Sequence, residues 1–179
     1  MPTVISHAVV GASLSVLAPN GIPRWRLAIV LVILPILPDL DVIGFSLGID
    51  YGHPLGHRGF THSFLFALLL AAILPSLIFR SIPLLSRSWF LLVSLLFTAT
   101  ASHGVLDAFT DAGLGVGFFI PFDNDRYFFP WRPIDTSPLS ISAFFNGPAL
   151  RILWSELVWI GTPLVVLVST VLIVRRRSR

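Results

Sequence analysis

The sequence predicts an all-α protein, a polytopic membrane bundle of about five helices with a long aromatic-rich outer loop. Hydrophobic residues make up 55% of the 179-residue chain and charged residues only 12%, with a mean hydropathy of +0.86. Soluble domains average about 45–50% apolar and about 25% charged residues, so lipid must solvate much of this surface. Five apolar stretches, separated by breaks rich in Gly, Pro or Ser, supply the helices. We therefore expect a single integral membrane domain over residues 1–179, with the lipid bilayer as its surroundings.

The five apolar stretches vary in how well they match the ~20 mainly apolar residues that a membrane-spanning helix needs. In chain order they are residues 3–18, 27–37 with an extension to 43, 63–79, 89–101 running on towards Asp107, and 157–174. The first is the weakest candidate and is expected either as a short span or as a helix inside the bundle. The third, fourth and fifth are the clearest. A long segment, 113–147, precedes the last stretch and contains the aromatic-rich run 118–131.

The Arg residues predict the orientation of the bundle. Short cytoplasmic segments of membrane proteins are enriched in basic residues, and the last apolar stretch is followed by Arg175, Arg176, Arg177 and Arg179. Counting back through five spans puts the Arg80/Arg87 and Arg24/Arg26 loops on the same side as this tail. We therefore expect a cytoplasmic C-terminus and an outward N-terminus. Arg residues spread in this way do not form a nucleic-acid surface, so no nucleic-acid partner is expected.

The His and Asp residues lie at those helix ends that the five-span topology places on the outer side. The chain has no cysteine, so thiolate metal ligands are excluded. The outward-facing candidates are His7 at the start of the first stretch, Asp39 and Asp41 at the end of the second, His57 and His62 before the third, and His103 and Asp107 at the end of the fourth. Ionisable groups in membrane segments are costly and are functional candidates by default.

Two short motifs have the spacing of metal ligands. His103 and Asp107 are four residues apart, which puts them on one helix face, where both can bind the same ion. The alternative is a His–Asp hydrogen bond that ties helix ends together. Asp39 and Asp41 can supply one ligand and one carboxylate that orients a His; the alternative is an ordinary helix end that reaches water. His7 can be a ligand or a helix-packing residue.

The segment from His57 to Ser63 is the most specific motif, because two His and an Arg stand directly before a long apolar helix. The His residues suit a borderline cation, and Arg58 suits a phosphate or carboxylate, which it can hold bidentately. The alternative for Arg58 is an anchor at the level of the lipid headgroups. Thr61 is expected to cap the helix that follows, and His53 is expected to be a solvated loop residue.

These motifs resemble the YdjM/YbcI-type membrane-bound metal-dependent hydrolases of prokaryotic inner membranes. The resemblance covers residues 1–135 and rests on Ser6-His7, Pro38-Asp39-Leu40-Asp41, His57-Arg58-Gly59 with His62-Ser63, and Ser102-His103 with Asp107. It implies a distant similarity to zinc-dependent phospholipase C and P1 nuclease. It also implies that Asp39, His62, His103 and Asp107 bind one zinc ion, and that His7 binds a second ion to which Asp107 bridges. Those soluble enzymes have further His and Glu ligands downstream, whereas this chain has no His after 103, so one or two ions are expected.

The function expected from these residues is metal-dependent hydrolysis of a phosphoester or lipid-linked substrate at the outer membrane boundary. A divalent cation, with Zn²⁺ the expected one, makes water a nucleophile near neutral pH. Asp41 or His57 is expected to act as a base or to orient a ligand, and Arg58 to hold a phosphoryl oxygen. Two alternatives stay open, a metal or ion transporter and a non-catalytic membrane protein with a structural metal site. The substrate's identity and the oligomeric state are not predicted.

Overall fold

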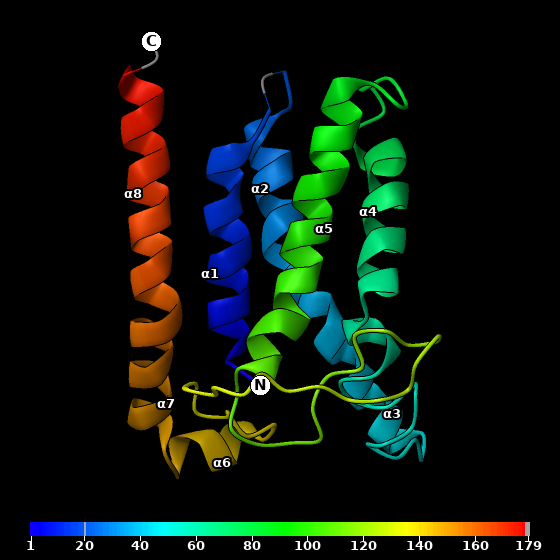
Figure 1. Cartoon of the computed structure of the whole chain (residues 1–179), viewed down its shortest axis with the longest axis vertical. Coiled ribbons are helices and arrows are strands. Elements are labelled where there is room, and N and C mark those ends of the chain that lie inside the picture. Colours follow the sequence, from blue (N-terminus) through cyan, green and yellow to red (C-terminus); the bar gives the residue numbers. More distant parts are fainter. Residues whose placement is uncertain (20, 178–179) are drawn as a thin grey trace.

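The computed structural model describes residues 1–19 and 21–177, and these fold into one bundle of antiparallel helical segments (Figure 1). Helix α1 is Val4–Leu14 and is followed by the 3₁₀ turn η1 Ser15–Leu17; α2 Arg24–Ile33 is continued by η2 Leu34–Val42 and α3 Ile43–Ser46. The next elements are η3 Phe60–His62, α4 Phe64–Ile78, α5 Arg87–Ala108 and α6 Ile141–Phe145. The last helix is formed by α7 Ala149–Glu156, the π-helical turn η4 Leu157–Gly161 and α8 Thr162–Arg177. The described residues form no sheet and only two isolated bridges. The predicted all-α membrane bundle is confirmed.

Three of the helical segments are long and apolar enough to cross a membrane, namely Arg24–Ser46, Arg87–Ala108 and Ala149–Arg177. Two predicted spans are shorter, Val4–Leu17 and Phe64–Ile78. The 15 residues of α4 extend only about 22 Å at 1.5 Å per residue, although the sequence made it one of the clearest candidates. The helix begins only after the folded segment 47–63, and it ends at Ile78, three residues beyond Pro75.

The two ends of the bundle differ in the residues they carry. The N-terminus lies at the lower end of Figure 1 and the C-terminus at the upper end, together with the α1–α2 and α4–α5 connections. Arg24, Arg80, Arg87 and the Arg175–Arg177 tail therefore share the upper end, as the five-span topology requires. Arg179 of the predicted tail lies outside the described residues. The long segment between α5 and α7 crosses the lower end, where it forms the predicted outer loop.

The upper half of the bundle is an apolar core. Leu27 and Leu31 of α2 pack with Leu92 and Leu96 of α5, and all four are fully buried. The backbones of α1 and α2 approach so closely at Gly11 that a Cβ atom there would lie 1.8 Å from the Leu31 carbonyl oxygen. Close backbone contact at small residues is how membrane helices gain packing energy without a hydrophobic driving force between them.

Helix α8 has no buried residue in the part of the chain described here, and its apolar side chains face outward. Leu164 of α8 packs against a small apolar cluster that includes Val10 of α1, and Glu156, the last residue of α7, is hydrogen-bonded to the start of α1. The backbone N–H and hydroxyl of Thr3 and the hydroxyl of Ser6 all donate to this buried carboxylate. Glu156 thereby satisfies donors at the N-terminus of α1, which would otherwise lack partners, and it fixes the helix that carries His7.

Candidate metal centre

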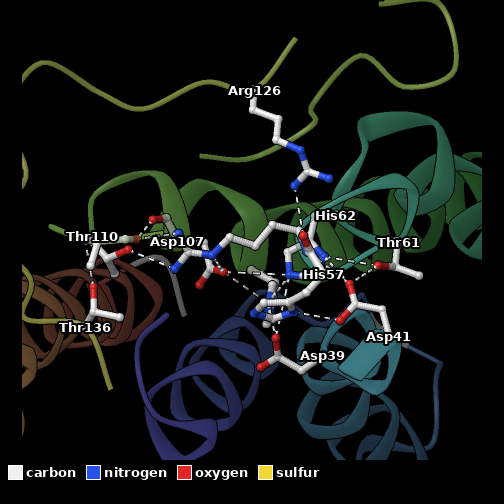
Figure 2. A network of polar contacts seen from close by, with 12 residues as sticks. Asp39, Asp41, His57, Thr61, His62, Asp107, Thr110, Arg126 and Thr136 are labelled. Atoms are coloured by element: carbon white, nitrogen blue, oxygen red, sulfur yellow. Dashed lines mark hydrogen bonds and ion pairs between the residues drawn. The ribbon is translucent and has the colours of Figure 1, made fainter. Parts of the chain in front are cut away.

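The lower half of the bundle encloses a cluster of ionisable side chains from four separate elements. His7 comes from α1, Asp39 from η2, His62 from η3, and both His103 and Asp107 from α5. All five are less than 9% exposed. The predicted convergence of these residues at one end of the bundle is therefore observed, and Figure 2 shows the contacts around Asp39, His62 and Asp107.

Four of these residues have the spacing of ligands around one ion. Nε2 of His62 and Nε2 of His103 are 3.0 Å apart, and they lie 3.6 and 3.3 Å from Oδ1 of Asp39. The same two nitrogens lie 3.7 and 3.9 Å from Oδ2 of Asp107. Ligand atoms held at about 2.0–2.2 Å by a tetrahedral ion are roughly 3.3–3.6 Å from one another. The four atoms therefore outline a site of the right size and donor type for Zn²⁺ or a similar cation.

The two carboxylates of this group are buried without a hydrogen bond in the described part of the chain, although Oδ2 of Asp107 forms an ion pair with Nε of Arg58 at 2.9 Å. Neither oxygen of Asp39 and neither oxygen of Asp107 has a hydrogen-bond partner among the described residues. A buried carboxylate without hydrogen bonds is costly, and such groups are normally paired or bind a metal. A cation among these oxygens and the two imidazole nitrogens would satisfy them, so the residues fit a divalent metal ion.

The two imidazole rings are held so that Nε2 of each points into the cluster. Nδ1 of His103 donates to the Pro35 carbonyl at 2.6 Å. That carbonyl is available because the residue three positions on in the 3₁₀ turn is Pro38, which has no N–H to donate. Nδ1 of His62 lies 3.2 Å from Oδ2 of Asp41. A partner on one ring nitrogen that directs the other at the ion is typical of metal-binding His residues.

Asp41 organises the side of the cluster nearest His57. It accepts from Nδ1 of His57 at 2.7 Å, from the Thr61 hydroxyl at 2.7 Å and from the Arg58 N–H at 3.2 Å. Asp41, His57 and His62 thus form a second group of closely spaced ligand atoms. The expectation that Thr61 caps the following helix is wrong, because the Ser63 hydroxyl accepts from the Phe66 N–H as the cap of α4. The hydroxyl of Thr61 is instead directed at Asp41.

His62 is outside the apolar helices, and its pKa reflects its carboxylate neighbours. Burial by itself lowers the pKa of this imidazole, but contacts with Asp39 and Asp41 and the charge of Asp107 raise it to about 9. Nε2 of His62 and Nε2 of His103 are within hydrogen-bond distance at 3.0 Å. A cation bound to Nε2 of His62 would require that nitrogen to be unprotonated, so the affinity for metal should decrease as the pH is lowered.

Arg58 contacts the cluster directly from inside the protein. Its side chain is 1% exposed, and Nε lies 2.9 Å from Oδ2 of Asp107. Nη1 donates to the Ala112 carbonyl at 2.9 Å and Nη2 to the Thr110 hydroxyl at 3.0 Å. The alternative of a headgroup-level anchor does not describe this buried side chain. His7 lies on the other side of Asp107, with Nε2 3.6 Å from Oδ1, and its ring stacks on that of His103.

Two comparisons place the chain among known proteins. The family model described as "YdjM inner membrane protein" matches residues 1–178. The chain belongs to this family. A relative, the inner membrane protein YbcI of Escherichia coli (strain K12), is 40% identical over 167 residues, which cover 91% of this chain and 92% of the relative. No solved structure matches. The predicted resemblance is confirmed for the YdjM family and extends beyond residue 135, whereas the likeness to phospholipase C and P1 nuclease stays a prediction.

Sequence reasoning missed several groups that position the site in this YdjM-family protein. Thr110 is three residues beyond Asp107 and therefore on the same side of the helix end, which is a signal that spacing provides. Arg126 is far from the cluster in sequence, yet it donates to the carbonyls of Tyr51, His53 and His57 and so holds the loop before Arg58 (Figure 2). No local pattern predicts this contact. His53 itself is exposed, as expected.

Proposed function

We propose that this inner membrane protein of the YdjM family is a metal-dependent hydrolase that cleaves a phosphoester or lipid-linked substrate at the outer membrane boundary. One observation carries the proposal. Four buried ligand atoms from Asp39, His62, His103 and Asp107 all lie within 4.8 Å of one another, and the carboxylates among them have no protein hydrogen bond. A bound divalent ion, with Zn²⁺ the expected one, supplies a Lewis acid that makes water nucleophilic near neutral pH.

An open position on the ion distinguishes catalytic from structural sites, which are closed by four protein ligands. Of the four residues, Asp107 is the weakest candidate for a ligand. Its Oδ2 has the longest separations from the imidazole nitrogens, and it is already paired with Nε of Arg58 at 2.9 Å. With Asp107 held by Arg58, the ion keeps Asp39 and two imidazoles and has room for water or substrate. This arrangement favours the hydrolase over a structural metal site.

His57 and Arg58 are the residues that would act on the substrate. Both line a cavity of about 210 Å³ beside the cluster, together with Tyr51 and Gly113; the four ligand residues are not part of its lining. Nδ1 of His57 is held by Asp41, which leaves the other ring nitrogen to take a proton. Arg58 has five N–H groups, and three contacts to Asp107, Ala112 and Thr110 leave two N–H groups for phosphoryl oxygens.

An apolar groove of about 520 Å³ between α4 and α5 supports a lipid-linked substrate. Phe64, Phe97 and Phe118 are among the residues that line it. The outer loop that covers one end of the groove is tied to the candidate site, because the Gly117 N–H donates to the Arg58 carbonyl. A lipid chain in the groove would thus lie next to a headgroup at the cluster. The groove faces outward from the bundle, where acyl chains are the surrounding solvent.

Variants of Asp107 and Arg58 test whether the metal is catalytic. Asp107→Asn preserves size but removes the negative charge that a divalent ion needs. It should lower the metal content and abolish turnover of bis(p-nitrophenyl) phosphate or a fluorescent phospholipid, while the protein stays monodisperse in detergent. Arg58→Ala should keep the ion bound by Asp39, His62 and His103 and lose turnover. Asp125→Asn, the same change on the exposed outer loop, is the matched control and should alter none of these quantities.

The same variants also address the structural alternative. If the metal only holds the fold, Asp107→Asn should lower the melting temperature strongly, and Arg58→Ala, which loses contacts to Asp107, Ala112 and Thr110 but no ligand, should lower it less. Full activity in Asp107→Asn would mean that the reaction centre lies elsewhere.

We propose further that the cluster faces outward and that the C-terminus is cytoplasmic, on the basis of the Arg residues at the opposite end of the bundle. Topology reporters fused after the C-terminal residue and within residues 113–119 should report opposite sides of the membrane. The same side for both fusions would contradict this orientation.

A further inference from the structure

The carboxylate of Asp107 has cationic or metal-binding groups on both of its oxygens. Oδ2 faces the ligand group and Nε of Arg58, and Oδ1 faces Nε2 of His7 at 3.6 Å. Neither nitrogen of His7 has a hydrogen-bond partner among the described residues, although the ring is completely buried. His7 and Asp107 therefore resemble half of a second cation site beside the first. A second ion would need both space and charge balance at this half-site.

Arg58 pairs with the other oxygen of the same carboxylate, Oδ2, and the fold holds it there. Its backbone has a φ of 61°, a left-handed conformation that non-glycine residues adopt only where the surroundings impose it. Thr110 and the Ala112 carbonyl fix the two terminal nitrogens at 3.0 and 2.9 Å. Gly113 has a φ of 99°, and a Cβ atom there would lie 2.7 Å from Nη1 of Arg58. The guanidinium is thus packed against backbone and has no alternative position nearby.

The balance of charge also favours a single ion. The buried carboxylates of Asp39, Asp41 and Asp107 carry three formal negative charges, and Arg58 contributes one positive charge. One divalent ion makes this group neutral. A second divalent ion would leave two uncompensated positive charges in a site that water barely reaches, which is strongly unfavourable.

We propose that the Arg58 guanidinium takes the place of a second metal ion, so that the site binds one divalent ion and His7 stays outside its coordination sphere. This inference rests on the metal site of the proposed function but not on hydrolysis. Arg58 pairs with the carboxylate that would otherwise bridge two ions. It thereby makes the centre mononuclear while its remaining N–H groups face the cavity.

Zinc stoichiometry tests the inference without any assay of activity. The full-length protein in detergent is stripped with a chelator, reloaded with excess Zn²⁺, desalted and analysed for bound metal. Wild type should hold one ion per chain. Arg58→Met, which keeps length but removes charge, should hold two. Arg58→Lys retains the charge and should hold one, and the double variant Arg58→Met/His7→Phe should return to one because it lacks the second imidazole.

The outcomes separate this inference from the proposed function. Two ions in wild type would overturn the inference and leave the metal site intact, and so would a single ion in Arg58→Met. No ion in wild type would overturn both. If Arg58→Met fails to fold, His7→Phe in the otherwise unchanged protein decides the matter. It keeps the ring stacked on His103 and should bind one ion with an affinity within about threefold of wild type. A loss of the ion, or a tenfold weaker affinity, would show that His7 is a ligand and overturn the inference.

Discussion

The two halves of helix α5 differ in the side chains that they bury. The half nearer the upper end contributes Leu92, Leu96 and Ala99 to an apolar core. Two turns further on, the same helix contributes His103 and Asp107, both fully buried. The upper half packs mainly aliphatic and small side chains. The lower half buries charges whose carboxylate oxygens have no hydrogen bonds. The contrast supports the proposal that the apolar half stabilises the fold and that the polar half binds a cation.

The energetic argument supports this division. A buried charge costs several kcal/mol unless it is paired and hydrogen-bonded, and apolar residues in place of Asp39 would avoid this cost. The elements that carry the ligands are also the irregular ones, since η2 and η3 are 3₁₀ segments and Arg58 has a left-handed backbone. Irregular backbone and unsatisfied polar groups tend to occur together at functional sites.

The largest effect is expected from Asp39→Asn, because both oxygens of Asp39 lack any other partner. Affinity for Zn²⁺ should fall more than ~100-fold, which exceeds the 10–100-fold typical of residues that only orient a ligand. Added Zn²⁺ should raise the melting temperature of wild type, since a ligand bound only to the folded state stabilises it. In Asp39→Asn this rise should disappear. The exposed Asp50→Asn is the control. An unchanged zinc-dependent rise in the melting temperature of Asp39→Asn would contradict the proposal that Asp39 binds the ion.

A smaller effect on the same measurement is expected from Asp41→Asn. Asp41 does not belong to the four-ligand group, but it accepts from Nδ1 of His57 and lies 3.2 Å from Nδ1 of His62. Loss of such an orienting carboxylate costs about 10–100-fold in metal affinity. One ion should therefore still bind at saturation. Loss of the ion even at high Zn²⁺ would place Asp41, rather than its neighbours, among the ligands.

Much of the site could be predicted from the sequence, because helix ends alternate between the two sides of a membrane. That rule alone brings Asp39, His62, His103 and Asp107 to one end. It does not give the contacts within the cluster. The pairing of Arg58 with Asp107 depends on a left-handed residue in an irregular loop, and the contact of His103 with the Pro35 carbonyl depends on the 3₁₀ geometry around Pro38. The length of α4 and the choice of Ser63 over Thr61 as its cap are likewise set by how segment 47–63 folds.

In the apolar half, Leu96→Ala should reduce stability and spare the metal site. Buried Leu→Ala changes cost about 2–5 kcal/mol in soluble cores, and the lower end, about 2 kcal/mol, is expected here because lipid also solvates a released leucine. Unfolding in mixed micelles measures the loss. Zinc stoichiometry should stay at one ion per chain. A loss of zinc with unchanged stability would show that the two halves are not independent.

The smallest effect is expected from Glu156→Gln, at the connection between α7 and α1. The amide oxygen of Gln can still accept from Thr3 or Ser6, but the charge-assisted bonds are weakened, which costs about 1 kcal/mol. The unfolding midpoint should fall slightly, and metal affinity should change little because His7 is not a ligand in this account. A large fall in metal affinity would make the position of α1 part of the site.

The central claim is that a divalent ion binds among Asp39, His62, His103 and Asp107. Crystals of the full chain grown with Zn²⁺ and measured on both sides of the zinc absorption edge locate the ion directly. The account predicts one anomalous peak in the cluster, within about 2.0–2.2 Å of Nε2 of His62, Nε2 of His103 and a carboxylate oxygen of Asp39. Zinc bound only at the surface, with no peak between the two imidazoles, would contradict it.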